Sequence, residues 1–241
     1  MQPINQELEI FNRYLHLFKI EREQFFALHR QMVTNHPEWI RNNDARTNLL
    51  AKPVNFLLTA LANFHLYRYA MHDIRFWEMT IGLNPVPPHE AEAAGFELMT
   101  FYRVATFTFL FSSIEHGCRA ILRTIDPTAH SEGAFKTVSD HLFTRAATVT
   151  NASKHIQLLD FMRIMRNTIH NNGVFLPVNG RDIEFVIDSH TYNFISGKRA
   201  EFFGWDTTLQ ILPPIRLLLV DLINAPEVLS CPMIEDIASH S

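Results

Sequence analysis

The segment 97-ELMTFYRVATFTFLFSSIEHGCRAILRTID-126 decides the fold class, because the whole stretch lacks proline and has the composition of a helix. Up to Phe111 its charged residues are Glu97 and Arg103, so this half is apolar on nearly every side. A helix that is hydrophobic all round lies inside a fold. We therefore expect a helix from about Glu97 to Asp126 at the centre of a mostly α-helical protein.

Two further helical regions precede this segment. Residues 5–33 place Leu8, Phe11, Leu15, Phe18, Phe25 and Leu28 on one stripe of a long amphipathic helix. Residues 52–82 repeat the helical pattern, with Pro53 in a first turn. The stretch 83-LNPVPPHEAEAAG-95 holds three prolines and predicts a loop. This loop separates an N-terminal helical region, residues 1–84, from a bundle formed by residues 90–241, and the sequence leaves open whether the first region is a separate sensor domain or lengthens the bundle.

The C-terminal half combines helices with a small β element. A short helix is expected near 133–146, and a longer one follows that starts at Asn151 or Ser153 and is stopped by Gly173. Residues 174–188 form two short runs around Asn179-Gly180, a strong hairpin signal. Residues 191–203 extend it to a meander, so the inserted hairpin covers 174–203. The last helix is expected to start at Pro213 or Pro214.

Composition and charge indicate a globular protein and exclude some functional classes. The chain has 241 residues, 47% hydrophobic and 19% charged, as in globular proteins. A net charge of −4 gives no basic excess for holding a long nucleic acid nonspecifically, so such contact requires a local patch. The apolar runs contain arginine and fall short of the roughly 18 uncharged residues of a membrane span. With no signal-peptide pattern and no metal or redox spacing at Cys118 and Cys231, we expect a soluble cytoplasmic protein without a membrane partner.

The segment 161-FMRIMRNTIHNNGVF-175 places four polar side chains on one stripe of a helix. Arg163, Arg166, Asn167 and His170 are three, four and seven residues apart. Metal-free RNA cleavage needs a base for the 2′-hydroxyl proton, an acid for the leaving oxygen, and cations that stabilise charge at phosphorus. The stripe supplies part of that set, and a second copy across a two-fold axis would supply the rest. The alternative is structural: basic residues in a last helical turn stabilise it by about 0.3–1 kcal/mol each.

The stretch 163-RIMRNTIHNNG-173 resembles the signature of the HEPN (higher eukaryotes and prokaryotes nucleotide-binding) superfamily. Its members share a four- or five-helix bundle, and active members carry an R-x4–6-H motif on a late helix. Arg163 and His170 are separated by six residues and fit this spacing, whereas Arg166 and His170 are separated by three and do not. The Arg166-Asn167 pair is nevertheless similar to the arginine of the family with its polar neighbour. Either arginine therefore remains a candidate.

A second stretch, 111-FSSIEHGCRAIL-122, resembles the earlier helix of the family that carries an acidic residue. The resemblance makes Glu115 the residue that orients an arginine of the motif. An ion pair between Glu115 and Arg119, four residues apart on a helix, is the alternative. The resemblance spans roughly residues 95–224, including a hairpin before the last helix as in abortive-infection-like and uncharacterised HEPN proteins.

The resemblance implies a metal-independent endoribonuclease, a toxin or antiviral defence effector of the abortive-infection type, that acts as a homodimer on RNA. An arginine would bind the phosphate, Asn167 would position it, and His170 would act as acid or base, with Glu115 and Asn171 in support. An antitoxin or other protein partner is expected as well. Since many HEPN proteins are inactive, the alternative is a scaffold that binds RNA, a nucleotide or a protein without cleavage.

Other residues that could carry chemistry give weaker patterns. Among thirteen histidines, His65 and His72 lie seven apart and His89 precedes Glu90, but none has the spacing of a metal motif. We expect no metal and no cofactor, and a metal-dependent helical enzyme is a third alternative. Tyr192 and Trp205 are candidates for stacking RNA bases, with packing as the alternative.

Overall fold

A computed structural model describes residues 3–41, 43–70 and 73–236. Their elements, in chain order, are α1 (Pro3–Asn35), α2 (Pro37–Arg41), α3 (Ala45–Ala70), α4 (Ile74–Ile81), α5 (Pro88–Ile125), α6 (Phe135–His141), a π-helical turn (Leu142–Ala146), α7 (Ala152–His170), β1 (Ile183–Ile187), β2 (His190–Phe194), α8 (Trp205–Ile223) and α9 (Pro226–Leu229). The two strands form one antiparallel sheet. The prediction of a mostly α-helical fold with a small β element before the last long helix is thus confirmed.

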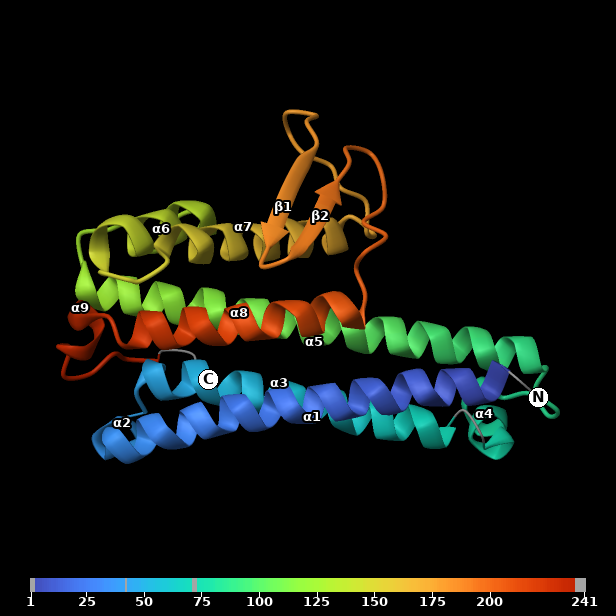
Figure 1. Cartoon of the computed structure of the whole chain (residues 1–241). Coiled ribbons are helices and arrows are strands. Elements are labelled where there is room, and N and C mark those ends of the chain that lie inside the picture. Colours follow the sequence, from blue (N-terminus) through green and yellow to red (C-terminus); the bar gives the residue numbers. More distant parts are fainter. Residues whose placement is uncertain (1–2, 42, 71–72, 237–241) are drawn as a thin grey trace.

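Helix α5 is the central element, as its apolar composition predicts. Phe107, Leu110, Phe111 and Ile114 are all buried. The helix packs against α3 on one side and against α6 and α7 on the other, and Figure 1 shows it running between these two groups of helices. It begins at Pro88, nine residues before the expected start, because the last of the prolines occupies a first helical turn where its missing N–H is not needed.

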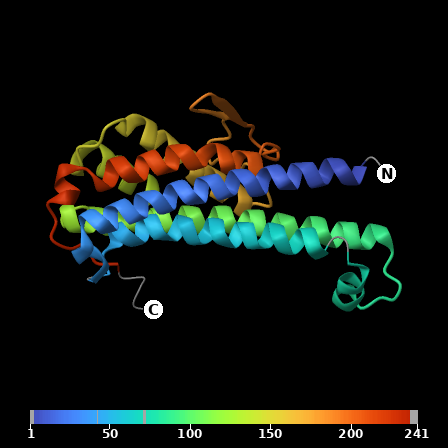
Figure 2. The same ribbon diagram turned by 60° about the horizontal axis from the view of Figure 1, so that its bottom comes forward.

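The N-terminal helices share one hydrophobic core with the rest of the described chain. Phe18 of α1 packs against Phe64 of α3 and Trp205 of α8, with ring centroids 5.5 and 5.4 Å apart. In Figure 2, α1 and α8 run side by side above α3 and α5. Both views show α1, α3 and α5 continuing past the start of α8.

Helix α3 is the one helix among the described residues that is long and apolar enough to cross a membrane, over Ala45–Tyr69. Leu50, Leu57 and Phe64 on one of its faces are buried in the common core. The core helix of a soluble protein has these same properties, and the fold is consistent with a soluble protein.

The β-hairpin turn is at Asp188-Ser189 and not at Asn179-Gly180, where the sequence signal predicts it. Asn179-Gly180 does form a turn, with the N–H of Gly180 donating to Pro177 at 3.1 Å. The paired strands, however, are 183–187 and 190–194, joined at Asp188-Ser189. Their inward side chains Phe185, Tyr192 and Phe194 pack on Phe161 of α7, with ring centroids 5.7, 4.7 and 5.9 Å away. The burial of these aromatic side chains against α7 therefore determines which strands pair.

Helix α8 begins at Trp205, eight residues before the expected start at Pro213. Pro213 and Pro214 lie inside the helix, so two backbone N–H groups are missing from its ladder. The turns before them persist because Trp205, Ile211 and Leu212 are buried, and tertiary packing overrides the local preference.

Candidate functional site

The candidate stripe occupies the outer face of the C-terminal half of α7. Met162 and Met165 point into the core and are fully buried, whereas Asn167 and His170 are exposed and Arg163 and Arg166 are half-buried. The four predicted side chains therefore share one solvent-facing side of the helix. Asn151 occupies the predicted capping position of α7, with a left-handed φ of 58° and without a side-chain capping bond.

Arg163 is held by an acidic residue on its own helix. Its Nε and Nη2 atoms donate to Oδ1 of Asp160 at 2.9 and 2.6 Å, and the amine of Lys136 lies 3.9 Å from the other carboxylate oxygen. The guanidinium charge is thereby balanced. Asp160 has no place in the predicted site, although its three-residue spacing from Arg163 is a signal for such a pair.

Arg166 differs from Arg163 in having no carboxylate partner among the described residues. Its Nη1 atom makes one long hydrogen bond, 3.4 Å, to Oδ1 of Asn167. Its Nε atom is buried and has no hydrogen-bond partner in that part of the chain. A guanidinium offers five N–H donors in a planar fork that matches phosphate and carboxylate oxygens. Arg166 therefore keeps donors for an anion, which Arg163 largely lacks.

His170 is the last residue of α7, and a tight turn follows it. The N–H of Asn171 donates to the carbonyl groups of Asn167 and Thr168, and Asn172 and Gly173 adopt left-handed φ angles of 54° and 80°. Asn171, the predicted supporting residue, is exposed beside His170. His170 is exposed, and within the described chain its ring makes no hydrogen bond.

Glu115, which the resemblance implies as the residue that orients an arginine of the stripe, makes its hydrogen bonds to Arg119 on its own helix. Its Oε1 atom accepts from Nη2 and Nε of Arg119 at 2.6 and 3.1 Å. The same guanidinium donates to the carbonyl oxygens of Ser131 and Gly133. Glu115 and Arg119 therefore fasten the loop between α5 and α6, and the alternative pairing of Glu115 is the one that the structure has.

The two aromatic residues considered for base stacking are buried instead. Tyr192 is packed on Phe161, donates to Oε1 of Gln210 at 2.7 Å, and has a pKa raised to about 12 by burial and by the charge of Asp188. Trp205 is 8% exposed between α1 and α3. Both residues are parts of the core, and neither offers a free ring face of the kind that single-stranded RNA needs.

The histidines considered as metal ligands do not meet. His65 and His89 are exposed on different helices, and His72 lies outside the described residues. In the ranges that the structure describes, no three His, Cys, Asp or Glu side chains come together as a metal site.

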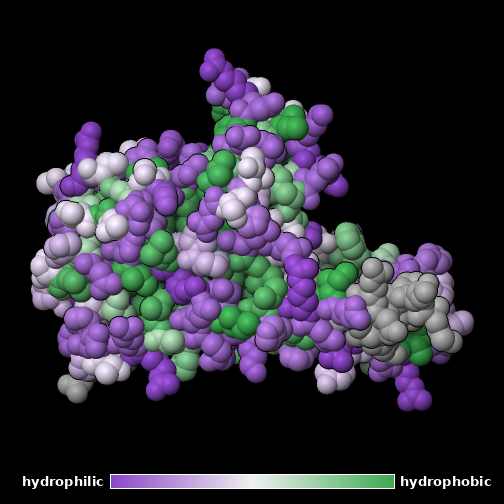
Figure 3. Space-filling view, in the orientation of Figure 1, coloured by the Kyte–Doolittle hydropathy of each residue, from purple (hydrophilic) through white to green (hydrophobic). Residues whose placement is uncertain are grey.

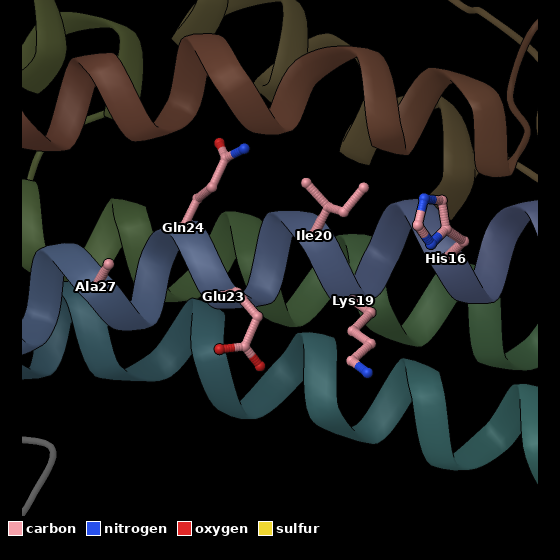
Figure 4. A pocket seen from close by; sticks show the side chains of 6 residues that line it. All are labelled: His16, Lys19, Ile20, Glu23, Gln24 and Ala27. Carbon is pink, nitrogen blue, oxygen red and sulfur yellow. The ribbon is translucent and has the colours of Figure 1, made fainter.

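The surface of α1 is hollowed beside α8, away from the stripe. Figure 4 shows this open depression of about 430 Å³, lined by His16, Lys19, Ile20, Glu23, Gln24 and Ala27. All six residues belong to one helix, so no polar groups converge from a facing wall. Hydrophilic and hydrophobic residues also alternate across this side of the molecule, as Figure 3 shows. The depression therefore lacks the convergent groups of a ligand site.

Comparison of the chain with known protein families, with curated proteins and with solved structures found no match.

Proposed function

We propose that the protein is a metal-independent endoribonuclease of the HEPN type, a toxin or antiviral effector of the cytoplasm that acts as a homodimer. The observation that carries the proposal is that Arg166 and His170 lie on the same solvent-facing side of α7. They are four residues apart, so about 6 Å separates them along the helix axis. One offers guanidinium donors without an acidic partner, and the other offers a free imidazole.

The division of labour follows from these properties. Arg166 binds the scissile phosphate and stabilises the charge that develops on it, since its donors are not taken by a carboxylate. Asn167, hydrogen-bonded to Arg166, helps to position the phosphate. His170 exchanges a proton, because imidazole titrates near neutral pH. The bond from phosphorus to the 5′-oxygen breaks as the 2′-oxygen attacks, leaving a 2′,3′-cyclic phosphate and a 5′-hydroxyl.

A single stripe holds one group of this kind, whereas the reaction uses both an acid and a base. A two-fold axis near the end of α7 supplies the second His170 from a second copy of the chain. The loop after α7 supports this arrangement, since Leu176 and Val178 are 61% and fully exposed there. Apolar side chains beside the stripe favour contact with another protein surface, either a second copy or an antitoxin.

Binding without cleavage is the second candidate, and one observation favours it. Arg163, the arginine with the spacing of active HEPN proteins, is neutralised by Asp160 at 2.6 Å, and Glu115 is engaged elsewhere. In that case Arg166 still holds a phosphate, of RNA or of a nucleotide, while no turnover follows.

The test is incubation of the purified protein with total RNA in EDTA, comparing wild type with His170→Ala and with His65→Ala. His65 is an exposed histidine on another helix, so its variant is the matched control. We expect wild type and His65→Ala to produce fragments ending in 2′,3′-cyclic phosphate and His170→Ala to be slower by roughly 10²–10⁴-fold. Equal cleavage by all three would refute the role of His170. RNA binding without cleavage by any of them, with the fold intact, would favour the scaffold.

The two arginines give a second prediction. We expect Arg166→Gln to reduce cleavage and RNA affinity, because it removes the unpaired cation of the stripe. Arg163→Gln is expected to cost less, since Asp160 already balances that charge. Single-turnover rates and affinities at several salt concentrations separate the two variants, and a greater loss in Arg163→Gln would assign the phosphate to Arg163.

A further inference from the structure

A second feature of the molecule, unrelated to the stripe, is a cavity of about 230 Å³ at the start of α8. It is lined by residues of α1, α3, α5 and α8. Its walls are mostly aromatic, with contributions from Phe11, Tyr14, Tyr67, Phe96 and Trp205. Four different helices supply these side chains, so the cavity is built by the tertiary fold and is not a groove along one helix.

One cation, Arg103, stands in this aromatic wall. Its Nε atom is buried and makes no hydrogen bond to any described residue, and its guanidinium carbon lies 5.3 Å from the centroid of the Phe203 ring. No carboxylate in the described chain comes within ion-pair distance of it. Burial lowers its pKa, against a smaller opposite effect of Tyr14. A half-buried cation without a partner is costly, and an aromatic ring compensates only part of that cost.

The neighbouring groups that could neutralise Arg103 are already engaged. Asp206, in the first turn of α8, accepts from Nη2 of Arg13 at 2.9 Å and from the hydroxyl of Tyr14 at 2.8 Å. The pKa of Tyr14 is raised to about 12 by burial and by Asp206, so its phenol remains neutral. The missing negative charge is therefore not supplied by either side chain.

We propose that this cavity binds a small organic monoanion, a carboxylate with a compact aromatic or branched apolar body. Arg103 binds the carboxylate through its free donors, and the aromatic walls enclose the apolar body. A single unpaired cation matches one negative charge. The volume is below that of a typical drug-sized site, about 300–1,000 Å³, and suits a ligand with roughly one ring.

The experiment titrates the whole protein with phenylacetate and with its neutral analogue phenylacetamide. Binding is followed through the indole N–H signals of ¹⁵N-labelled tryptophan. The chain has three tryptophans, of which Trp205 lines the cavity, whereas Trp39 packs on Arg46 and Trp77 lies in α4. We expect the Trp205 signal to shift with phenylacetate at concentrations at least tenfold lower than with phenylacetamide, while the other two signals stay in place.

Two variants test the role of the cation. Arg103→Met keeps the length of the side chain and removes its charge, so we expect it to bind the acid and the amide equally. Arg123→Met, on the same helix but about 30 Å away along its axis, is the matched control because its partner Glu132 is exposed, and it should keep the preference. Equal binding of acid and amide by wild type, or no shift of Trp205 with either, would overturn the proposal even if Arg103→Met fails to fold.

Discussion

At the scale of single residues, the ion pair of Asp44 and Arg46 is fully buried, so its stability depends on every polar group having a partner. The carboxylate oxygens of Asp44 accept from Nε and Nη2 of Arg46 at 2.8 and 2.6 Å, and Oδ2 also accepts from the N–H of Ile234 at 3.0 Å. The remaining nitrogen of Arg46 donates to the carbonyl oxygens of Val228 and Cys231. The pair therefore joins the start of α3 to the C-terminal segment, and every group in it has a partner.

Removing the charge of Arg46 should destabilise the protein, because the charge of Asp44 stays buried. We expect Arg46→Met to lower the free energy of unfolding by about 3–5 kcal/mol, because it leaves Asp44 buried without a counter-charge. Arg123→Met breaks an exposed pair and should cost under about 1 kcal/mol. Urea unfolding of both variants measures the two losses in the free energy of unfolding. Equal losses would show that the burial of the Asp44–Arg46 pair does not increase its contribution to stability.

The residues of the candidate site illustrate what a sequence predicts at this scale. Helical spacing alone places Arg163, Arg166, Asn167 and His170 on one face, and the structure puts them on one solvent-facing side of α7. Spacing does not tell which arginine is free, because that depends on whether Asp160 turns towards Arg163. It also does not find the cavity around Arg103, because three other helices, α1, α3 and α8, contribute to its walls.

At the scale of elements, the sequence predicts most of the long helices and the strand-forming runs, but not how the strands pair. Periodicity locates α1, α3 and α5, since each buries a stripe or more of apolar side chains. The strand pairing depends on which aromatic side chains reach Phe161 of α7, and the Asn179-Gly180 signal carries no information on that contact. Likewise, Pro213 marks a helix start by local preference, whereas burial of Trp205 extends α8 beyond it.

The turn after α7 gives a prediction about an element boundary. Gly173 has a φ of 80°, donates to the carbonyl of Thr168 at 2.9 Å and accepts from the N–H of Ala200 at 3.0 Å. A Cβ atom there would meet nothing within 4 Å, so a substitution is opposed by the backbone conformation alone. We expect Gly173→Ala to cost about 1–2 kcal/mol.

The matched variant is Gly173→Asn, because asparagine visits the left-handed region more readily than alanine. It should be more stable than Gly173→Ala in thermal unfolding, although its side chain is larger. The opposite order would mean that space, and not φ, limits this position.

At the scale of the whole molecule, the C-terminal segment after α9 is attached to α3 and α5. Oδ1 of Asp236 lies 2.8 Å from Nε2 of His116 on α5, and Oδ2 accepts from Asn48 of α3 at 2.7 Å. Lys52 approaches Oδ2 at 3.7 Å. Together with Asp44 and Arg46, these contacts attach the segment after α9 to the N-terminal half, so residues 1–84 and 90–241 are tied together at this end as well as through the core.

The contribution of this attachment to stability should depend on pH. Burial by itself raises the pKa of Asp236, but the hydrogen bonds from Asn48 and His116 and the charges of Lys52 and His116 outweigh it, so the pKa lies below its ordinary value. A carboxyl group whose pKa is lowered by folding stabilises the protein above the ordinary pKa of about 4, and this contribution is lost as the pH falls through the lowered value. Asp236→Asn should therefore be less stable than wild type at pH 5.

The difference between Asp236→Asn and wild type should narrow as the pH falls from 5 to 2.5, because the wild-type carboxyl becomes protonated and loses its advantage over the amide. Asp126 and Glu227 also have lowered pKa values, but both proteins contain them, so their acid response cancels in the comparison. Urea unfolding midpoints over this pH range provide the measurement. A difference that stays constant with pH would mean that Asp236 acts through its shape and hydrogen bonds, and that its charge does not hold the C-terminal segment in place.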